Sequence, residues 1–271
     1  MRALLRDQST ASGAQHRSEV EALLQSLAAA HGPRYRLLPG PPPPGEAGAW
    51  LRADRLFSPD SPELVRLLDS EYHGSGHRTE HAAALTLIAV YAGWVTAAGV
   101  LQWALDGRVL DLRPENVLVR PAGPEGHGIA GVRMYAPRLV EPGRASVHAT
   151  VLGGHLLPLA EALHRRTRAG LRQLRGGVAH GCATALCASA APVEEMAVRW
   201  REFAGDAPGG LAGLGDVERV TRSSPSPGRT SRLVYLRRTC CLFYTSAEAV
   251  RCASCCLTPR EERLRAYAAR T

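Results

Sequence analysis

The spacing of hydrophobic and polar positions near the start of the chain predicts two helices. Ser18 and Glu21 have the spacing of a capping box, and leucines follow on one face, so we expect a helix over 18–30. A stiff, proline-rich loop follows at 39–45. The Ser-Pro-Glu run that opens 61–72 predicts a second helix, because proline is favoured at the first helical position.

Helical patterns return in the second half of the chain. Apolar positions predict helices over 145–168, 177–190 and 192–204. Pro158 predicts a kink in the first of these, because proline cannot donate a backbone hydrogen bond. Residues 258–261 (Thr-Pro-Arg-Glu) form another capping box, so we expect the chain to end in a helix beside the cysteines that precede it.

Three short runs predict strands. Asn116 to Arg120 and Gly131 to Ala136 are joined by a Gly- and Pro-rich turn, which predicts a β-hairpin. Residues 232–236 alternate and predict a strand that leads into the C-terminal cysteines. The predicted fold class is mainly α with a small β-hairpin or sheet (α+β), in which a helical body is followed by a C-terminal cluster-binding segment.

Passages rich in Gly, Ser and Pro separate the body from the C-terminus. They cover 208–215 and 223–228. We therefore expect a helical body with a central hairpin over residues 1–222 and a small C-terminal segment over 223–271. A chain of 271 residues is long enough to bury a large core in one or two domains.

The 24 residues from Ala82 to Leu105 carry no charge, which is long enough for a helix to span a bilayer. The segment is mainly Ala, Gly, Thr and Val, and Gln102 adds a polar amide, so its free energy of membrane insertion would be weak. We predict a buried core helix and no stable membrane insertion. A division into two helices near Gly93 or Gly99 stays open.

The net charge of +8 is carried by arginine, since the chain contains no lysine. The arginines are dispersed and aromatic residues make up only 5%, so the sequence offers no stacking platform for nucleic acid. The charge favours anionic small molecules or an acidic electron donor as partners.

Five of the seven cysteines lie in the last 32 residues and carry the clearest chemical signal. Cys240 and Cys241 are adjacent, ten residues separate them from the pair Cys252 and Cys255, and Cys256 follows directly. A C-x-x-C turn presents two thiolates to one metal site. Adjacent cysteines usually point apart, so Cys240 and Cys241 need a bend to serve one centre. Four thiolates meet the demand of a [2Fe–2S] rhomb, with two for each iron.

Zinc and disulfides are the alternatives for these cysteines. A structural Cys₄ zinc site usually has two C-x-x-C turns, and this sequence has one. Residues 1–7 are charged and lack an apolar core, so we expect no secretory signal and no oxidising compartment that would favour disulfides. The spacing favours an iron–sulfur cluster.

The stretch 237–244, Arg-Arg-Thr-Cys-Cys-Leu-Phe-Tyr, followed by Cys252-x-x-Cys255, resembles the signature of the FhuF-type ferric siderophore reductases. That family carries C-C-x10-C-x-x-C at its C-terminus, with basic residues before it and an aromatic residue after it. The resemblance is diffuse over the rest of the chain. It implies that Cys240, Cys241, Cys252 and Cys255 hold a [2Fe–2S] cluster, and we expect their four sulfurs to converge.

Cys256 departs from the family pattern, which often has proline at this position. Because adjacent side chains usually diverge, we expect Cys256 to point away from the cluster, towards the final helix. Replacement of Cys255 by Cys256 as a ligand is the alternative.

Two arginines precede the cysteine pair. A four-thiolate cluster is anionic in both redox states, so Arg237 and Arg238 should favour the reduced form and raise the reduction potential. Ion pairs of these arginines with Glu261 or Glu262 are the alternative.

The resemblance implies a one-electron reduction that releases Fe(II) from a ferric siderophore in the cytosol. The expected partners are the ferric siderophore and an electron donor, either ferredoxin-like or a flavin reductase, and no nucleic acid. We expect a cytoplasmic location, with a peripheral place at the inner face of the membrane left open. The substrate pocket should lie between the helical body and the cysteine motif. A non-enzymatic redox sensor or electron-carrier module is the alternative function.

Other polar patterns are weaker. His73, His77 and His81 are four residues apart and could share a metal, but Gly74 and Gly76 interrupt the helix, and a solvated helix start is the favoured interpretation.

The pattern Asp111-x4-Asn116 is faintly similar to a kinase catalytic loop, yet the histidine, the arginine and a glycine-rich phosphate loop are missing, so we expect no kinase chemistry. Cys182 and Cys187 lie among small residues and are expected to be buried thiols that act as small hydrophobes.

Overall fold

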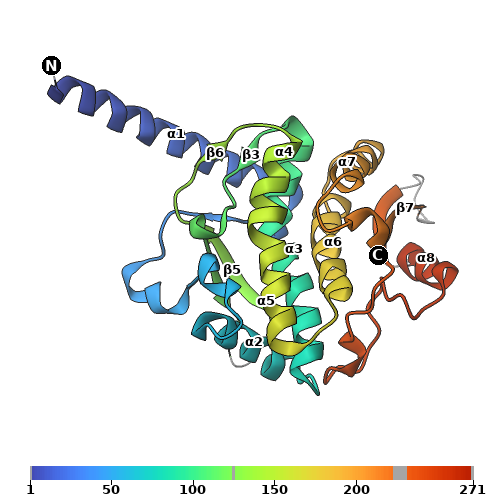
Figure 1. Ribbon diagram of the computed structural model, residues 1–271. Helices are drawn as coiled ribbons and strands as arrows, with labels where there is room; N and C mark the ends of the chain where they lie inside the picture. The colour runs from blue at the N-terminus through green and yellow to red at the C-terminus, as the bar shows by residue number, and fades with distance from the viewer. Residues whose placement is uncertain (1, 124–125, 222–230, 270–271) are drawn as a thin grey trace.

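The computed structural model describes residues 2–123, 126–221 and 231–269, with side chains from residue 15 onward. Helix α3 (Glu80–Asp106) lies at the centre, and α5 (Leu157–Thr167) and α6 (Leu171–Cys187) lie beside it (Figure 1). Small strands lie on one side of these helices, and the C-terminal strands and α8 (Arg260–Ala269) lie on the other (Figure 1). The predicted fold class, mainly α with small sheets, is confirmed.

Helix α3 is the uncharged segment singled out from the sequence. It is the one described helix long and apolar enough to cross a membrane, and 83% of its most apolar window is buried inside the protein. The Thr79 hydroxyl caps its start by accepting a hydrogen bond from Ala82 N, and Gly107, with φ 79°, follows its end. The helix continues through Gly93 and Gly99 without a break, so a core helix is confirmed and a division into two is wrong.

Helix α6 packs closely on α3 because it has glycine at the contact. A Cβ at Gly177 would lie 2.6 Å from Ile88 Cγ2, and one at Gly181 would lie 2.4 Å from Ala92 Cβ. No side chain larger than hydrogen fits at either position. The sequence pattern predicts a helix that starts at residue 177, whereas α6 starts at Leu171. The glycines therefore serve helix packing and do not mark a helix end.

The remaining N-terminal and middle helices largely follow the predictions. Helix α2 (Pro62–Gly74) begins as expected, with Ser61 accepting a hydrogen bond from Leu64 N, and α7 (Val193–Gly205) matches its prediction. Helix α1 (Arg2–His31) starts well before the predicted residue 18. The residues ahead of Ser18 are mostly good helix formers without proline, so the helix extends through the capping-box pattern.

The segment predicted as one kinked helix has three parts. Helix α4 (Arg144–Val147) continues into a π-helical segment, His148–Leu156, which leads into α5 with Pro158 in its first turn. Leu157 N–H donates to the carbonyl of the residue five positions back. The distortion thus lies before Pro158 and consists of wide π-helical turns. Proline, which has no backbone N–H to donate, fits at little cost into the helical turn that comes next.

A four-stranded sheet lies beside the helices in the order β1 (Leu38–Pro39), β5 (Ile129–Met134), β4 (Val117–Pro121), β2 (Leu51–Arg52). Antiparallel pairing of β4 with β5 confirms the predicted hairpin, and a second, two-stranded sheet pairs β3 (Val109–Leu110) with β6 (Leu139–Val140). Short 3₁₀ helices occupy connections at Pro33–Tyr35, Pro44–Ala49, Ala53–Phe57, Pro114–Asn116, Leu211–Leu214 and Phe243–Thr245.

The C-terminal region is built on the antiparallel pair of β7 (Gly215–Thr221) and β8 (Ser231–Arg237). The strand predicted at 232–236 is confirmed. Strand β7 has no counterpart among the predicted elements, because charged residues occupy most of its central positions. The predicted domain boundary at 222/223 and the passage 223–228 lie outside the described residues, and the division into two domains stays a prediction.

Helix α8 covers the outer face of this strand pair. An apolar cluster joins the strands to the helix through Val220, Val234, Leu236, Leu264, Tyr267 and Ala268. The helix begins at Arg260, one residue later than predicted, because the Pro259 carbonyl accepts the first helical bond from Arg263 N. The chain thus ends in a helix, as the capping-box pattern predicts.

We expect Gly181→Ala to lower the free energy of unfolding by about 1–3 kcal/mol, because the new methyl group overpacks the contact between α6 and α3. Thermal unfolding followed by circular dichroism measures the change. Gly205→Ala in α7 is the control, since its Cβ would meet nothing within 4 Å. Equal free energies of unfolding for the two variants would show that the contact between α6 and α3 accommodates an added methyl group.

Candidate functional site

The alternation of β8 separates the two arginines that precede the cysteine pair. Leu233 and Tyr235 point into the main core, while Val234 and Leu236 face α8. Arg237 continues the inward series and is only 3% exposed. Arg238 points outward and forms an ion pair with Asp216 of β7, with Nη2 and Oδ1 2.7 Å apart.

A tight bend follows the strand at the vicinal cysteines. Leu242 adopts φ 56°, and its N–H lies 3.4 Å from the Cys240 sulfur. Immediately before the pair, Thr239 packs onto α6 at Gly176, where any Cβ would lie 1.9 Å from the Thr239 hydroxyl oxygen. The Cys241 carbonyl accepts a hydrogen bond of 3.4 Å from Thr86 of α3. The bend that the sequence requires is therefore present and is held against both central helices.

The loop between the two cysteine pairs is anchored at the end of α2. Ala247 N–H donates to the Ser75 carbonyl at 2.9 Å. Gly76, with φ 58°, lies so close to Ala247 that an added Cβ would be 2.8 Å from the alanine methyl. Arg263 of α8 donates to the carbonyls of Arg237 and Ser254, and so fastens the final helix to both cysteine segments.

The C-terminal thiols lie in two groups. Cys241 and Cys252 influence each other's ionisation, and the thiol of Cys256 interacts electrostatically with those of Cys240 and Cys255. In the described ranges no three His, Cys, Asp or Glu side chains are grouped as ligands of a single ion. The approach of the four sulfurs to within the span of a two-iron rhomb stays a prediction. Two groups of thiols on adjacent segments suit a centre with two iron atoms, each of which takes two thiolates.

The position of Cys256 differs from the prediction. Its thiol interacts electrostatically with that of Cys240 as well as with that of Cys255. The physical reason is the turn at 252–255, closed by Cys255 N–H donating to the Cys252 carbonyl at 2.9 Å, so that the following residue comes back towards the vicinal pair. The assignment of Cys255 as the fourth ligand stays a prediction.

The electrostatic surroundings of Cys241 favour the thiolate form of its side chain. A hydrogen bond from the Cys252 thiol lowers the pKa of Cys241, and the charge of Arg237 acts in the same direction against the effect of burial. The same hydrogen bond and burial raise the pKa of Cys252. Two buried nitrogens of Arg237, Nε and Nη2, have no hydrogen-bond partner among the residues that the structure describes. A buried, unpaired guanidinium beside two cysteines fits an anionic four-thiolate cluster.

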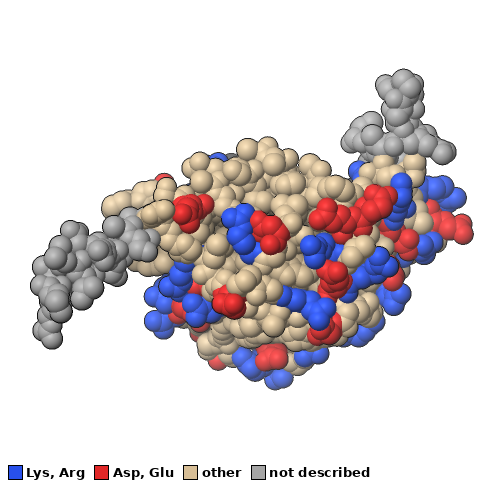
Figure 2. Space-filling model, turned by 90° about the horizontal axis from the view of Figure 1, so that it is seen from above, with Lys and Arg blue, Asp and Glu red and all other residues tan. Residues whose placement is uncertain are grey.

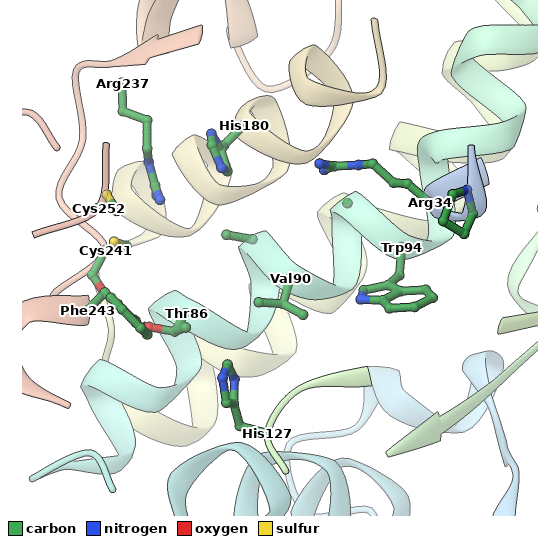
Figure 3. A pocket seen from close by; sticks show the side chains of 13 residues that line it. Arg34, Thr86, Val90, Trp94, His127, His180, Arg237, Cys241, Phe243 and Cys252 are labelled. Carbon is green, nitrogen blue, oxygen red and sulfur yellow. Dashed lines mark hydrogen bonds between the residues drawn. The ribbon is translucent and has the colours of Figure 1, made fainter. Parts of the chain in front are cut away.

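A cavity of about 690 Å³ opens beside the cysteines (Figure 3). Helix α3 supplies one wall, from Thr86, Ala89, Val90, Gly93 and Trp94. The C-terminal motif supplies the opposite end, from Arg237, Cys241, Phe243 and Cys252. Pro33, Arg34, His127 and His180 complete the lining. The cavity thus lies between the body and the motif, where the sequence predicts a pocket without naming its residues.

Figure 3 shows Arg34 and His180 pointing towards this cavity from different elements, and the Cys241 and Cys252 sulfurs at one end of it. Burial lowers the pKa of His180, and the charges of Arg237 and Arg34 lower it further, so its imidazole is neutral at neutral pH. The sequence singles out neither Arg34 nor His180, which lie far from the motif along the chain.

The three histidines at 73, 77 and 81 do not form a site together. Helix α2 ends at Gly74, as the glycines predict, and His81 lies in α3. His77 is buried, with Nε2 3.8 Å from Glu71 Oε1 and its ring against Phe243, so a solvated position is wrong for this residue. Burial raises the pKa of Glu71.

Asp111 and Asn116 serve the fold. The buried Asp111 carboxylate accepts hydrogen bonds from Arg113 and Arg138, which lower its pKa against the opposing effect of burial. The Asn116 amide donates to the carbonyls of Asp111 and Ala136. With its oxygens engaged in this way, Asp111 is a structural group.

Cys182 and Cys187 lie in α6, away from the C-terminal motif. Cys182 is fully buried and Cys187 half-buried. Burial raises the pKa of each thiol to about 12, which makes both poor nucleophiles, as expected for thiols that act as small hydrophobes.

Comparison with known proteins agrees with this geometry. A family model described as the FhuF 2Fe-2S C-terminal domain matches residues 237–257, which include all five C-terminal cysteines. No curated protein matches the chain. The chain is therefore an iron–sulfur protein whose cofactor is a [2Fe–2S] cluster. Over these residues the chain is similar to the C-terminal domain of the FhuF-type family.

We expect serine at Cys240, Cys241, Cys252 or Cys255 to bleach or shift the visible absorption of anaerobically purified protein, because each substitution removes one thiolate from the cluster. Iron content and the electron paramagnetic resonance spectrum provide independent measurements. Cys182→Ser and Cys187→Ser are controls that should keep the native spectrum. A native spectrum and full iron content in all four ligand variants would contradict the assignment.

Cys256→Ser should keep the full iron content, because Cys255 completes the C-x-x-C turn. The structure makes this a demanding test, since the Cys256 thiol lies beside that of Cys240. Iron content of the two single variants, measured side by side, decides the assignment. Loss of iron in Cys256→Ser with retention in Cys255→Ser would make Cys256 the fourth ligand.

Proposed function

We propose that this protein is a ferric siderophore reductase that releases Fe(II) by one-electron reduction. The observation that carries the proposal is the cavity of about 690 Å³ lined by two of the predicted ligand cysteines, Cys241 and Cys252. A chelate of drug-like size fits a cavity of this volume. Its iron would then lie near the cysteine end, where an electron has a short path.

The reaction transfers one electron from an external donor to the siderophore iron, which changes from Fe(III) to Fe(II). A cluster bound by the cysteines supplies this chemistry, because a [2Fe–2S] centre carries one electron at a time. The hard oxygen donors of a siderophore hold Fe(II) much more weakly than Fe(III), so the metal dissociates from an intact chelator. No acid–base residue of the protein is required.

The residues of the chain have three tasks in this proposal. The bend at Leu242 and the anchor at Ser75 hold the two cysteine segments together. The largely apolar wall of α3 excludes water from the space beside them. Arg237 places a buried positive charge next to the cysteines, which stabilises added negative charge and raises the reduction potential.

A non-enzymatic redox sensor or electron carrier is the alternative. A carrier must expose its cluster to protein partners, but it has no need of a large cavity that ends at the cysteines. A sensor would need a surface for nucleic acid or a partner. On the face shown in Figure 2, arginine and acidic side chains are interspersed, with no area of one sign. The enzyme is therefore the better proposal.

The partners in this proposal are a ferric siderophore and an electron donor, either ferredoxin-like or a flavin reductase. The protein would act in the cytoplasm, where imported siderophores are unloaded. The mostly buried α3 agrees with this location.

The reaction is tested by mixing the anaerobically reduced protein with a ferric siderophore and a chromogenic Fe(II) chelator. We expect the absorption of the oxidised cluster to return while the Fe(II) complex appears in equal amount. The Cys252→Ser variant controls for reduction without the cluster. Reoxidation by small electron-transfer proteins but by no ferric siderophore would support the carrier instead.

Arg237→Gln should lower the midpoint potential of the cluster by on the order of 50 mV, because a buried positive charge that favours the reduced form is lost. Arg238→Gln is the matched control and should leave the potential nearly unchanged, since Arg238 is exposed and paired with Asp216. Redox titration followed by visible absorption measures both. Arg237→Lys, which keeps the charge, should restore most of the potential.

The sequence predicts that both arginines tune the reduction potential of the cluster. We propose that only Arg237 does so. The alternative ion pairs with Glu261 or Glu262 do not occur among the described residues, where Arg238 has Asp216 as its partner instead. Equal potentials in the Arg237→Gln and Arg238→Gln variants would contradict the proposed role of the inward arginine.

A further inference from the structure

Apart from the two cysteines, Cys241 and Cys252, the cavity that the proposed reductase uses is lined by positive and neutral side chains. Arg34 and Arg237 line it together with two histidines, and none of its lining residues is acidic. The charges of the whole chain are more evenly balanced, with 25 acidic residues and 33 arginines. From this charge distribution we propose that the pocket binds ferric chelates of net negative charge, of the class whose ligands include carboxylate or hydroxycarboxylate groups. The inference rests on the proposed function and specifies its substrate.

The two arginines have different surroundings. Arg237 lies at the cysteine end, where its charge acts on Cys241 and Cys252 and is balanced in part by the thiolates. Arg34 comes from the 3₁₀ helix Pro33–Tyr35 and points into the cavity from another side (Figure 3). Of the two arginines in the lining, Arg34 is therefore the one whose charge is available to a bound ligand.

Arg34 is held in place without being neutralised. Its Nη2 donates to the Thr184 hydroxyl of α6 at 2.9 Å. Within the described part of the chain, no carboxylate forms an ion pair with it. A Cβ at Gly93 would lie 3.4 Å from Arg34 Nη2, so the guanidinium lies close to the backbone of α3. A guanidinium with donors to spare matches the two oxygens of a carboxylate, which it can bind in a bidentate manner.

The other walls suit the body of such a ligand. Val90, Ala89 and Pro33 are apolar, and the Trp94 side chain is 37% exposed at the cavity. These side chains can cover the hydrocarbon part of a chelator while its carboxylate meets Arg34. At the Arg34 side of the cavity a chelate of net positive charge would meet a guanidinium and no carboxylate of the lining, so its binding there carries an electrostatic penalty.

Binding is tested with gallium(III) complexes, because Ga(III) has the charge of Fe(III) and is not reduced under these conditions. Isothermal titration calorimetry on the cluster-containing protein would compare three complexes. One is anionic with carboxylate groups, one is a neutral trihydroxamate and one is a trihydroxamate with a free ammonium group. We expect the anionic complex to bind at least about tenfold more tightly than the other two, with an affinity that falls as salt is raised.

Arg34→Gln should weaken the anionic complex by about tenfold and change the neutral complex by less than about twofold. Arg36→Gln is the matched control, since Arg36 is an exposed arginine two residues away that does not line the cavity. Equal affinity of the three complexes, or an equal effect of the Arg34 and Arg36 substitutions, would overturn the inference.

The reduction assay separates this inference from the proposed function. Reduction of neutral or cationic ferric siderophores in preference to the anionic one would support the reductase and overturn the charge preference. Tight binding of the anionic gallium complex without reduction of its ferric counterpart would support the binding site and contradict the reductase.

Discussion

The close contact between α3 and α6 is the constraint on which the rest of the site depends. Gly177 and Gly181 let the two helices approach until their backbones nearly touch. Gly176, the residue before Gly177, lets Thr239 dock on α6, which fixes the start of the cysteine bend. The same pair of helices supplies the α3 wall of the cavity and His180. A wider spacing would enlarge the cavity and move the cysteines away from it.

The second feature that determines the site is the alternation of side chains along β8, which point in turn to the two faces of the strand. Its two faces serve different cores, with Tyr235 packed against α6 and Leu236 against α8. Arg237 follows the inward face although burial of an unpaired guanidinium is costly. The strand tolerates this cost when anionic thiolates lie beside the side chain. The same arrangement that stabilises the arginine therefore sets the electrostatics of the cluster, and Arg238, one residue on, is left to pair with Asp216.

Local signals in the sequence were enough for much of this structure. The uncharged run identified α3, the Ser61 cap identified α2, and the cysteine spacing identified a two-iron centre. Signals that depend on tertiary contact were misread or missed. Gly177 was predicted to start a helix, yet it lies inside α6, where its lack of a side chain allows the contact with α3. Cys256 was expected to diverge from its neighbour, but the turn at 252–255 returns it to Cys240. Arg34 and His180 carry no local signal, since only the fold brings them to the cavity.

The connection between the two cysteine pairs explains why a helical body accompanies so short a motif. Ten residues separate Cys241 from Cys252, and a free loop of this length would sample many conformations. Its attachment to Ser75 and its close fit at Gly76 remove most of that freedom before any metal binds. Thr86 fixes the Cys241 carbonyl on α3, and Arg263 ties the strand end to the Cys252 turn. Because Phe243 and Cys252 of this same segment also line the cavity, the contacts that preorganise the cluster site also shape the pocket. Release of the loop from α2 would then loosen both at once, so the cluster site and the cavity form one cooperative unit.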